Sequence, residues 1–292
     1  MKTLRLTPYS KSGWLVAAMC LFLAATTASA QSVVAHWSFD SSSLGTDGSG
    51  NITTAADSTG NHDAAVGSNG GTGGGGYTSS PFPGSDSVAG AFGQGLMFNG
   101  NNFMVFSNLT ELMQANGAPS YTISFWVNVP AGSAGGATPY ETFTDWGNAP
   151  AGAGTAKYVY CFGPAGSTSV STQTRFGTGN GTTIFGHTST TAKVDDGSWH
   201  MLTWTFDTTT GLLNIYFDGA FVESFTATGG SFQMANSASP LGCFGLKGDN
   251  GYMLPSGFKL DEAWVFAGVL DTNQVANLYA GNSILKEGRL LT

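Results

Sequence analysis

The sequence has 292 residues, of which 10% are charged, 12% are aromatic and 43 are glycine. Its 18 acidic residues outnumber its 10 basic ones and give a net charge of −8; this argues against nucleic-acid binding, because surfaces for nucleic acid are basic. A chain poor in charge and rich in glycine and aromatic residues is typical of many short strands joined by turns. A helical bundle is therefore excluded.

Residues 1–30 have the pattern of a secretory signal peptide. Three basic residues open the segment, an apolar run follows at 14–25, and Ala28-Ser29-Ala30 offers a cleavage site before Gln31. The run is shorter than the roughly 20 residues that a transmembrane helix needs, and no later segment is apolar enough to span a membrane. We therefore expect a bacterial protein that is secreted or held at the cell surface.

The first half of the mature chain alternates short apolar runs with polar stretches. Val33–Asp40 predicts a strand. Ser41–Asp86 is rich in Ser, Gly, Asn and Thr and predicts a long surface excursion, with a Gly/Ser-rich insertion around 65–90. Ala91–Phe106 predicts two short strands around the turn Asn99-Gly100-Asn101, and Leu109–Asn116 a short helix.

The second half contains longer strand patterns and one helix. In Tyr121–Val129 every second residue is apolar, although Trp126 interrupts the polar face. Trp199–Asp207 and Leu212–Asp218 flank a turn and predict a hairpin, and the turn Asp218-Gly219 leads into the next strand. Further strands are expected at 157–163, 172–177, 221–226, 241–246 and 258–266, and a helix at 272–280 that begins at Asp271 or Thr272 as its cap.

These elements indicate one domain over residues 31–292, since no charged linker or Pro-rich hinge divides it. Strands without intervening helices predict an all-β fold, an antiparallel β-sandwich of the jelly-roll type with one short C-terminal helix. Cys161 and Cys243 remain after the signal peptide. They could form a disulfide in an oxidising compartment, or they could be two buried thiols.

Four stretches in this order resemble the LamG-like jelly-roll domains of the concanavalin A-like lectin/glucanase superfamily. They are AHWSFD with DSTGNHDA downstream, GQGLMFNGNNFMVF followed by YTISFWVNV, residues 195–224, and residues 259–280. The resemblance implies a jelly-roll sandwich. The sequence departs from the family in its Gly-rich insertion and in the Ala/Gly/Pro loop at 149–154.

Within this superfamily, laminarinase-type enzymes carry two glutamates that flank an aspartate on one strand. Hydrolysis needs the pair because one carboxyl group acts as an acid and the other as a nucleophile. No such spacing occurs among the glutamates of the mature chain, and the histidines have no metal-type spacing. We therefore expect a protein that is not an enzyme.

The resemblance also implies a structural calcium ion between the first strand, the FNG-type turn and the last strand. The matching positions are Asp40, Asn99, Gly100 and Asp261, and Asp57 in the DSTGN loop is a further candidate. Alternatively, Asp40 and Asp57 form Asx-turns. Asp261 needs a partner in either case, because it lies inside an apolar strand.

Two segments combine aromatic and polar residues and predict glycan-binding loops. In the first, Tyr140–Asn148, the candidates are Tyr140, Asp145, Trp146 and Asn148; in the second, Lys247–Tyr252, they are Asp249, Asn250 and Tyr252. Sugar rings stack on aromatic faces while carboxylates and amides bind hydroxyl groups. The alternative is that these aromatic residues belong to the core.

Taken together, the sequence favours an exported, non-catalytic domain that recognises a glycan or an extracellular protein. The alternative is a structural or assembly protein of the bacterial cell surface or extracellular matrix. A binder is expected to present a concave aromatic patch, and an assembly protein a flat sheet edge or an apolar patch.

Overall fold

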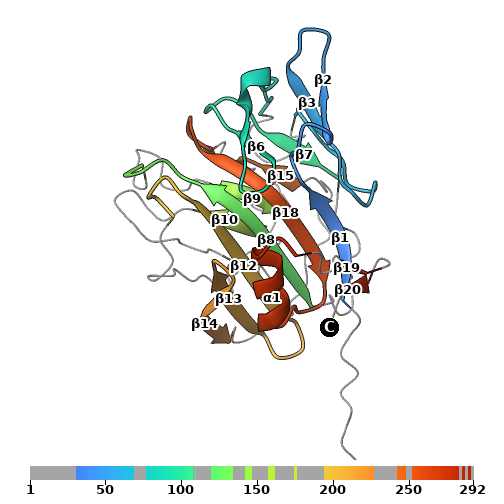
Figure 1. Cartoon of the computed structure of the whole chain (residues 1–292), viewed down its shortest axis with the longest axis vertical. Helices are drawn as coiled ribbons and strands as arrows, with labels where there is room; N and C mark the ends of the chain where they lie inside the picture. Colours follow the sequence, from blue (N-terminus) through green and yellow to red (C-terminus); the bar gives the residue numbers. More distant parts are fainter. Residues whose placement is uncertain are drawn as a thin grey trace, which may run out of the picture.

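The computed structural model describes residues 31–68, 77–107, 109, 120–133, 142–146, 157–161, 174–175, 194–226, 242–247, 252–282, 285–286 and 289–290. Over these residues the chain forms two eight-stranded antiparallel sheets and one short α-helix. The sheets lie face to face, as Figure 1 shows, and enclose an aromatic core in which Trp37 of one sheet contacts Phe106 and Phe244 of the other. The predicted antiparallel β-sandwich is confirmed.

The first sheet, called sheet A, has β8 and β18 at its centre. Its strands, in spatial order, are β14 (Ala220–Thr226), β13 (Leu212–Phe217), β12 (Trp199–Asp207), β8 (Tyr121–Asn128), β18 (Lys259–Ala267), β6 (Gln94–Met97) and β5 (Ser87–Ala89), while β1 (Ser32–Trp37) pairs with β18. The predicted β12–β13 hairpin is present. Asp218 and Gly219 both have positive φ, 49° and 78°, in the turn that leads into β14, as a tight hairpin turn requires.

The second sheet, called sheet B, includes much of the segment that the sequence predicted as a surface excursion. Its order is β11 (Thr174–Arg175), β10 (Lys157–Cys161), β9 (Thr142–Trp146), β15 (Gly242–Phe244), β7 (Met104–Phe106), β4 (Ala64–Ala65), β3 (Ile52–Ala55) and β2 (Leu44–Thr46). The prediction for residues 41–86 is therefore wrong in its first part. Ile52, Ala55 and Phe82 are buried in the core, because these short strands extend sheet B over sheet A.

Several small elements complete the described chain. They are the 3-10 turn η1 (Gly84–Asp86) and two two-stranded ribbons, β16 (Leu246–Lys247) with β17 (Tyr252–Met253) and β19 (Leu285–Lys286) with β20 (Arg289–Leu290). The predicted strands around Asn99-Gly100-Asn101 exist as β6 and β7, but they lie in different sheets. The chain thus crosses from sheet A to sheet B at residues 98–103. The signal peptide and most of the predicted helix at 109–116 lie outside the described residues.

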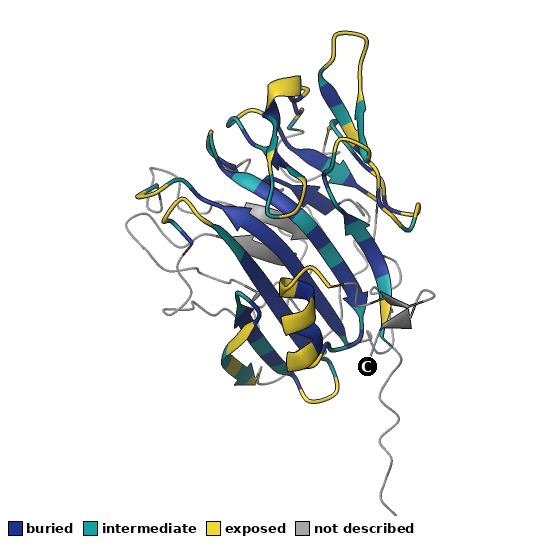
Figure 2. Ribbon diagram, in the orientation of Figure 1, coloured by how far each residue is buried: buried dark blue, intermediate teal, exposed yellow. Residues whose placement is uncertain are grey.

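Helix α1 (Thr272–Tyr279) covers the outer face of sheet A, the face that points away from sheet B. Asp271 is its N-cap: the Asp271 side chain accepts a hydrogen bond from the Gln274 backbone, and the Gln274 side chain accepts one from the Asp271 backbone. Buried Thr122 of β8 connects the helix to the sheet, since its hydroxyl donates to Gly268 O and accepts from Leu270 N. In Figure 2, β8 is buried along its length and α1 exposes only its outward side. No helix of the described part is long and apolar enough to cross a membrane.

The two cysteines lie in sheet B on opposite sides of β9. Cys161 of β10 is opposite Thr142, and Cys243 of β15 is opposite Asp145. Two strand spacings amount to about 10 Å, which exceeds the roughly 7 Å that Cα atoms of a disulfide can span. The disulfide considered from the sequence therefore does not fit this pairing, and Cys243 is buried.

Candidate functional site

Strand β18 contains a β-bulge that brings polar side chains to the outer face of sheet A. Asp261 pairs with Trp126 and Trp264 pairs with Ser124, so β18 has one residue more than β8 in this interval. Glu262 within the bulge has φ of 47°, a left-handed conformation that is strained for a residue with a side chain. Because of the extra residue, Leu260 faces the core whereas Trp264 faces outward. Leu260 and Trp264 therefore lie on opposite faces of sheet A.

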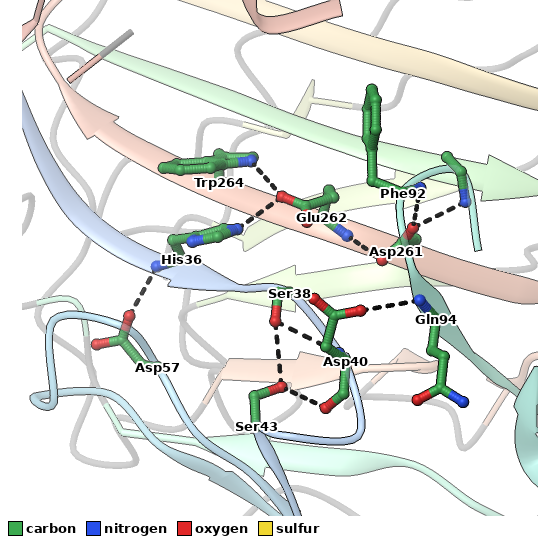
Figure 3. Close-up of polar contacts among 11 residues, drawn as sticks. His36, Ser38, Asp40, Ser43, Asp57, Phe92, Gln94, Asp261, Glu262 and Trp264 are labelled. Carbon is green, nitrogen blue, oxygen red and sulfur yellow. Dashed lines mark hydrogen bonds and ion pairs between the residues drawn. The ribbon is translucent and has the colours of Figure 1, made fainter. Parts of the chain in front are cut away.

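His36, Glu262 and Trp264 form one cluster on this face, which we call the His36 cluster (Figure 3). The His36 and Trp264 rings, paired across β1 and β18, stack with centroids 3.4 Å apart. Glu262 Oε2 accepts hydrogen bonds from His36 Nε2 at 2.7 Å and from Trp264 Nε1 at 3.0 Å. Since the carboxylate only accepts, Nε2 of His36 carries a proton. The His36 and Glu262 side chains are 14% and 15% exposed, so a ligand at the surface could reach them only at their edges.

Asp57 fixes the loop that follows β3 against β1. Its Oδ1 accepts from His36 N at 2.7 Å and from Thr59 N at 3.2 Å. Its Oδ2 accepts from Asn61 N and His62 N, both at 3.2 Å, and from the Thr59 hydroxyl. The side chain is buried. These bonds match the Asx-turn interpretation of Asp57 and occupy both carboxylate oxygens.

Asp261 binds the loop that precedes β6, and Figure 3 shows this loop above it. Its Oδ2 accepts from Ala91 N at 2.8 Å and from Phe92 N at 3.0 Å, and its Oδ1 accepts from Glu262 N at 2.8 Å. The side chain is fully buried. Burial raises the pKa of Asp261 to about 8, and the negative charge of Glu262 acts in the same direction, while the backbone N–H donors oppose both. The partner expected for Asp261 from its position in an apolar strand is thus a set of backbone amides.

Asp40 binds the other end of the same loop. Its Oδ1 accepts from Gln94 N at 2.8 Å. Asp40 and Asp261 therefore hold the two ends of one short loop, at 91–94, and fix its path across the end of sheet A. In this arrangement both carboxylates accept hydrogen bonds from backbone N–H groups.

Asn99 and Gly100 belong to a separate group around Asp86, a residue that the sequence did not indicate. Asp86 Oδ2 accepts from Asn99 Nδ2 at 3.4 Å and from Asn102 Nδ2 at 3.3 Å, and Asn99 N donates to Asn102 Oδ1 at 3.0 Å. Gly100 has φ of 90° in this turn. Asp86 is buried, and burial raises its pKa, while the two amides oppose this effect.

The predicted calcium ligands are therefore distributed over three groups. Asp57 lies beside β1, Asp40 and Asp261 hold the loop at 91–94, and Asn99 and Gly100 lie with Asp86. Among the residues that the structure describes, no group of three or more His, Cys, Asp or Glu side chains could hold a metal ion. A calcium site built from these five residues stays a prediction.

The first predicted glycan-binding loop is a strand over much of its length. Residues 142–146 form β9, in which Asp145 is opposite Cys243 and Trp146 is opposite Tyr158. Of the second segment, Lys247 and Tyr252 pair in the β16–β17 ribbon. Tyr140, Asn148, Asp249 and Asn250 lie outside the described residues, and the glycan-binding role of both segments stays a prediction.

The sequence did not indicate the His36 cluster because its members are far apart in the chain. His36 and Glu262 are 226 residues apart. The only local signal is the pair Glu262 and Trp264 on one strand, which is not specific. His200, also on sheet A, stacks its ring on Phe217.

The sequence profile of the concanavalin A-like lectin/glucanases superfamily matches residues 98–276. The chain belongs to this superfamily. A search of curated proteins finds no match. The concanavalin A-like fold agrees with the two packed antiparallel sheets, and the match extends from the crossover between the sheets into α1.

Solved binding domains of two toxins give the same fold at low sequence identity. The receptor-binding domain of botulinum neurotoxin D is 11% identical with a TM-score of 0.55, over 89% of this chain and 56% of that one. The binding domain of Paraclostridial Mosquitocidal Protein 1 is 15% identical with a TM-score of 0.53, over 86% and 52%. Domain 4 of AbnA, an extracellular arabinanase from Geobacillus stearothermophilus in complex with arabinotriose, is 20% identical with a TM-score of 0.49, over 86% and 100%. This concanavalin A-like chain thus spans about half of the toxin chains.

Proposed function

We propose that the protein is an exported recognition domain that binds a glycan without cleaving it. Membership of a superfamily that includes lectins and glucanases supports a carbohydrate ligand. The signal-peptide pattern of residues 1–30 supports export. Intact-mass measurement of the exported protein is expected to give a chain that begins at Gln31.

The arrangement of the carboxylates carries the non-catalytic part of the proposal. The two glutamates of the described chain, Glu223 on β14 and Glu262 on β18, are separated by β13, β12 and β8. Four strand spacings amount to about 19 Å, whereas the two carboxyl groups of a glycosidase lie roughly 5–10 Å apart. Asp40, Asp57 and Asp261 are committed to backbone N–H groups. Such carboxylates hold loops and are poorly suited to act as nucleophiles.

A structural calcium ion remains a proposal, now centred on the Asn99 turn. Calcium prefers carboxylate, amide and backbone oxygens, and the Asn99 turn holds the Asp86 carboxylate beside the side-chain amides of Asn99 and Asn102. Burial raises the pKa of Asp86, so a cation beside this carboxylate would compensate its desolvation. Bound there, calcium would supply rigidity to the crossover between the sheets.

The test measures binding and turnover on the same mature protein. Binding to a panel of soluble polysaccharides is measured by affinity electrophoresis, and release of reducing ends is measured over a day with the same substrates. Retarded migration on at least one polysaccharide without new reducing ends is the expected result. New reducing ends would overturn the non-catalytic assignment. Unchanged migration with every polysaccharide of the panel would overturn the proposal that the ligand is a glycan.

A further inference from the structure

Three large apolar side chains are exposed in the part of the chain that the structure describes, and all three lie on the outer face of sheet A. They are Phe92 at 36% exposure, Tyr279 at 38% and Phe221 at 50%. Tyr279 ends α1, Phe92 lies in the loop at 91–94, and Phe221 lies on β14, which packs beside the helix. We call these three residues the aromatic ledge. Their grouping is notable because isolated exposed apolar residues are ordinary, whereas contiguous ones mark binding surfaces.

A buried tryptophan holds two of the ledge rings in place. Tyr279 stacks on Trp126 with ring centroids 5.2 Å apart and an interplanar angle of 16°. Phe92 meets the same indole edge to face, at 5.5 Å and 87°. Tyr279 is 38% exposed, so part of its ring remains available to a ligand. The backbone of Phe92 is in turn fixed by its bond to Asp261.

The third ring is fixed from the neighbouring strands. Phe221 packs edge to face on Tyr216, at 5.7 Å and 74°. The turn between β13 and β14 passes directly against Tyr279: a Cβ atom at Gly219 would lie 2.7 Å from Tyr279 Cβ. The ledge therefore runs from the loop at 91–94 across the end of α1 to β14. Its rings are preorganised, which reduces the entropy lost on binding.

The rim of the ledge is polar but almost free of charge. Helix α1, with the sequence TNQVANLY, contains no charged residue, and its exposed residues include Asn273 and Asn277. Asn282 lies three residues beyond the helix, and its N–H is bonded to Asn277 O. The carboxylate of Asp218 in the adjacent turn is engaged by His200 Nδ1 at 2.8 Å and by Met201 N at 2.9 Å. Flat aromatic faces beside amide groups suit sugar rings with hydroxyl groups, and the lack of charge suits an uncharged polymer.

We propose that the aromatic ledge is the surface on which this domain binds a neutral polysaccharide. Tyr279 and Phe92 stack on sugar rings, Phe221 extends the contact along the polymer, and Asn277 and Asn282 bind hydroxyl groups. The inference rests on the proposed glycan-binding function and specifies its location and ligand class. It places binding on the outer face of sheet A rather than at the two segments predicted from the sequence.

The test compares ledge variants with matched variants elsewhere in the full mature protein. The probes are soluble neutral polysaccharides (dextran, arabinan, xylan, galactomannan and mixed-linkage glucan) with polygalacturonate as an anionic comparison. For the polysaccharide that binds, Tyr279→Ala is expected to weaken affinity about fivefold, since a stacked aromatic contributes on the order of 1 kcal/mol. Phe221→Ala is expected to weaken it several-fold, and Tyr279→Phe to retain it. Thr54→Ala, an exposed substitution on sheet B, is expected to leave it unchanged, and Trp146→Ala tests the segment predicted from the sequence.

The outcomes separate this inference from the function on which it rests. Because Tyr279 packs on Trp126, thermal unfolding is measured for each variant, and Phe221→Ala at an unchanged Tm carries the test if Tyr279→Ala fails to fold. If the ledge variants bind the polysaccharide with wild-type affinity and Trp146→Ala loses affinity, the ledge is not the binding surface. The proposed glycan-binding function then remains intact. Tighter binding of polygalacturonate than of any neutral polymer overturns the ligand class. The wild-type protein could also self-associate, and the ledge variants could convert it into a monomer without a change in glycan affinity. That result identifies the ledge as an interface between copies and overturns the inference.

Discussion

Leu260 and Trp264 lie four residues apart on β18, yet they face opposite sides of sheet A. Leu260 is opposite Val127 and belongs to the core, whereas Trp264 is opposite Ser124 and stacks on His36. The extra residue in the bulge at Glu262 reverses the alternation between them. One strand thereby contributes both to the core and to the polar cluster on the outer face.

Replacement of Asp57 by alanine is expected to be among the most destabilising changes to a polar residue. Its carboxylate accepts bonds from three residues of its own loop and from His36 N, and alanine would leave several of these donors without acceptors. We expect a loss of about 2–5 kcal/mol in the free energy of unfolding, measured by urea denaturation. Asp47→Ala is the control, because Asp47 forms a similar turn at an exposed position. Equal losses in the two variants would contradict the prediction.

Asp261 makes stability depend on pH near neutrality. Its pKa is raised to about 8 in the folded state, whereas in the unfolded chain it is about 3.9. Between these values the folded protein keeps a proton that the unfolded chain has released, so the free energy of unfolding falls as pH rises and levels off above pH 8. Tm measured from pH 5 to pH 9 is expected to decrease.

Asp261→Asn is expected to remove this slope, because an amide does not titrate in this range. It is also expected to lower Tm at all pH values, because the amide NH2 group is a donor and would face backbone N–H donors. Asp47→Asn is the matched control. Hydrogen bonds from Asn51 and neighbouring backbone groups lower the pKa of Asp47, so it titrates below this range and its substitution is expected to leave the slope unchanged. A Tm that rises with pH in the wild-type protein would refute the assignment.

Gly245→Ala is expected to disrupt the core, because a Cβ atom at this position would overlap the ring of buried Phe98. Gly50 has nearly the same φ, 81° against 80°, but open space around it. Gly50→Ala therefore isolates the backbone penalty of roughly 1–2 kcal/mol, and Gly245→Ala should cost at least about 2 kcal/mol more. Urea denaturation of the two variants measures the difference. Similar midpoints would show that Phe98 moves aside.

Calcium is expected to raise the Tm of metal-stripped protein if it binds at the Asn99 turn. A ligand that binds only the folded state at a hundredfold excess over its Kd stabilises it by about 2.7 kcal/mol. Asp86→Ala is expected to abolish the difference between calcium and chelator, whereas Asp261→Ala should lower Tm but preserve that difference. Identical wild-type melting curves in calcium and in chelator would exclude the site.

Long apolar patterns and local capping signals predicted much of the fold. The alternation in Tyr121–Val129 predicts β8, the spacing around the Thr-rich turn predicts the β12–β13 hairpin, and Asp271 predicts the start of α1. Each of these signals is contained within one element. Local sequence is sufficient where an element buries one face and ends at a recognisable turn or cap.

The errors arise where neighbouring strands, rather than local sequence, determine the structure. β3 has the sequence ITTA and β4 only two alanines, so neither has an apolar run that distinguishes a strand from a loop. The bulge at Glu262 carries no glycine or proline to mark it. Asp86 and Asn102 meet only because the chain crosses between the sheets.

The pairing of β1 with β18 has a consequence for the kinetics of folding. Ser32 is opposite Ala267, so the first described strand can pair only after nearly the whole chain has been synthesised. Bringing together residues so far apart in the chain costs conformational entropy before the stabilising contacts can form. Chains of this topology therefore fold slowly. Until β18 is available, the side of β8 that it will occupy has unpaired backbone groups, which invite association with other chains. We therefore expect the newly made chain to depend on a chaperone for longer than a domain whose strands pair in sequence order.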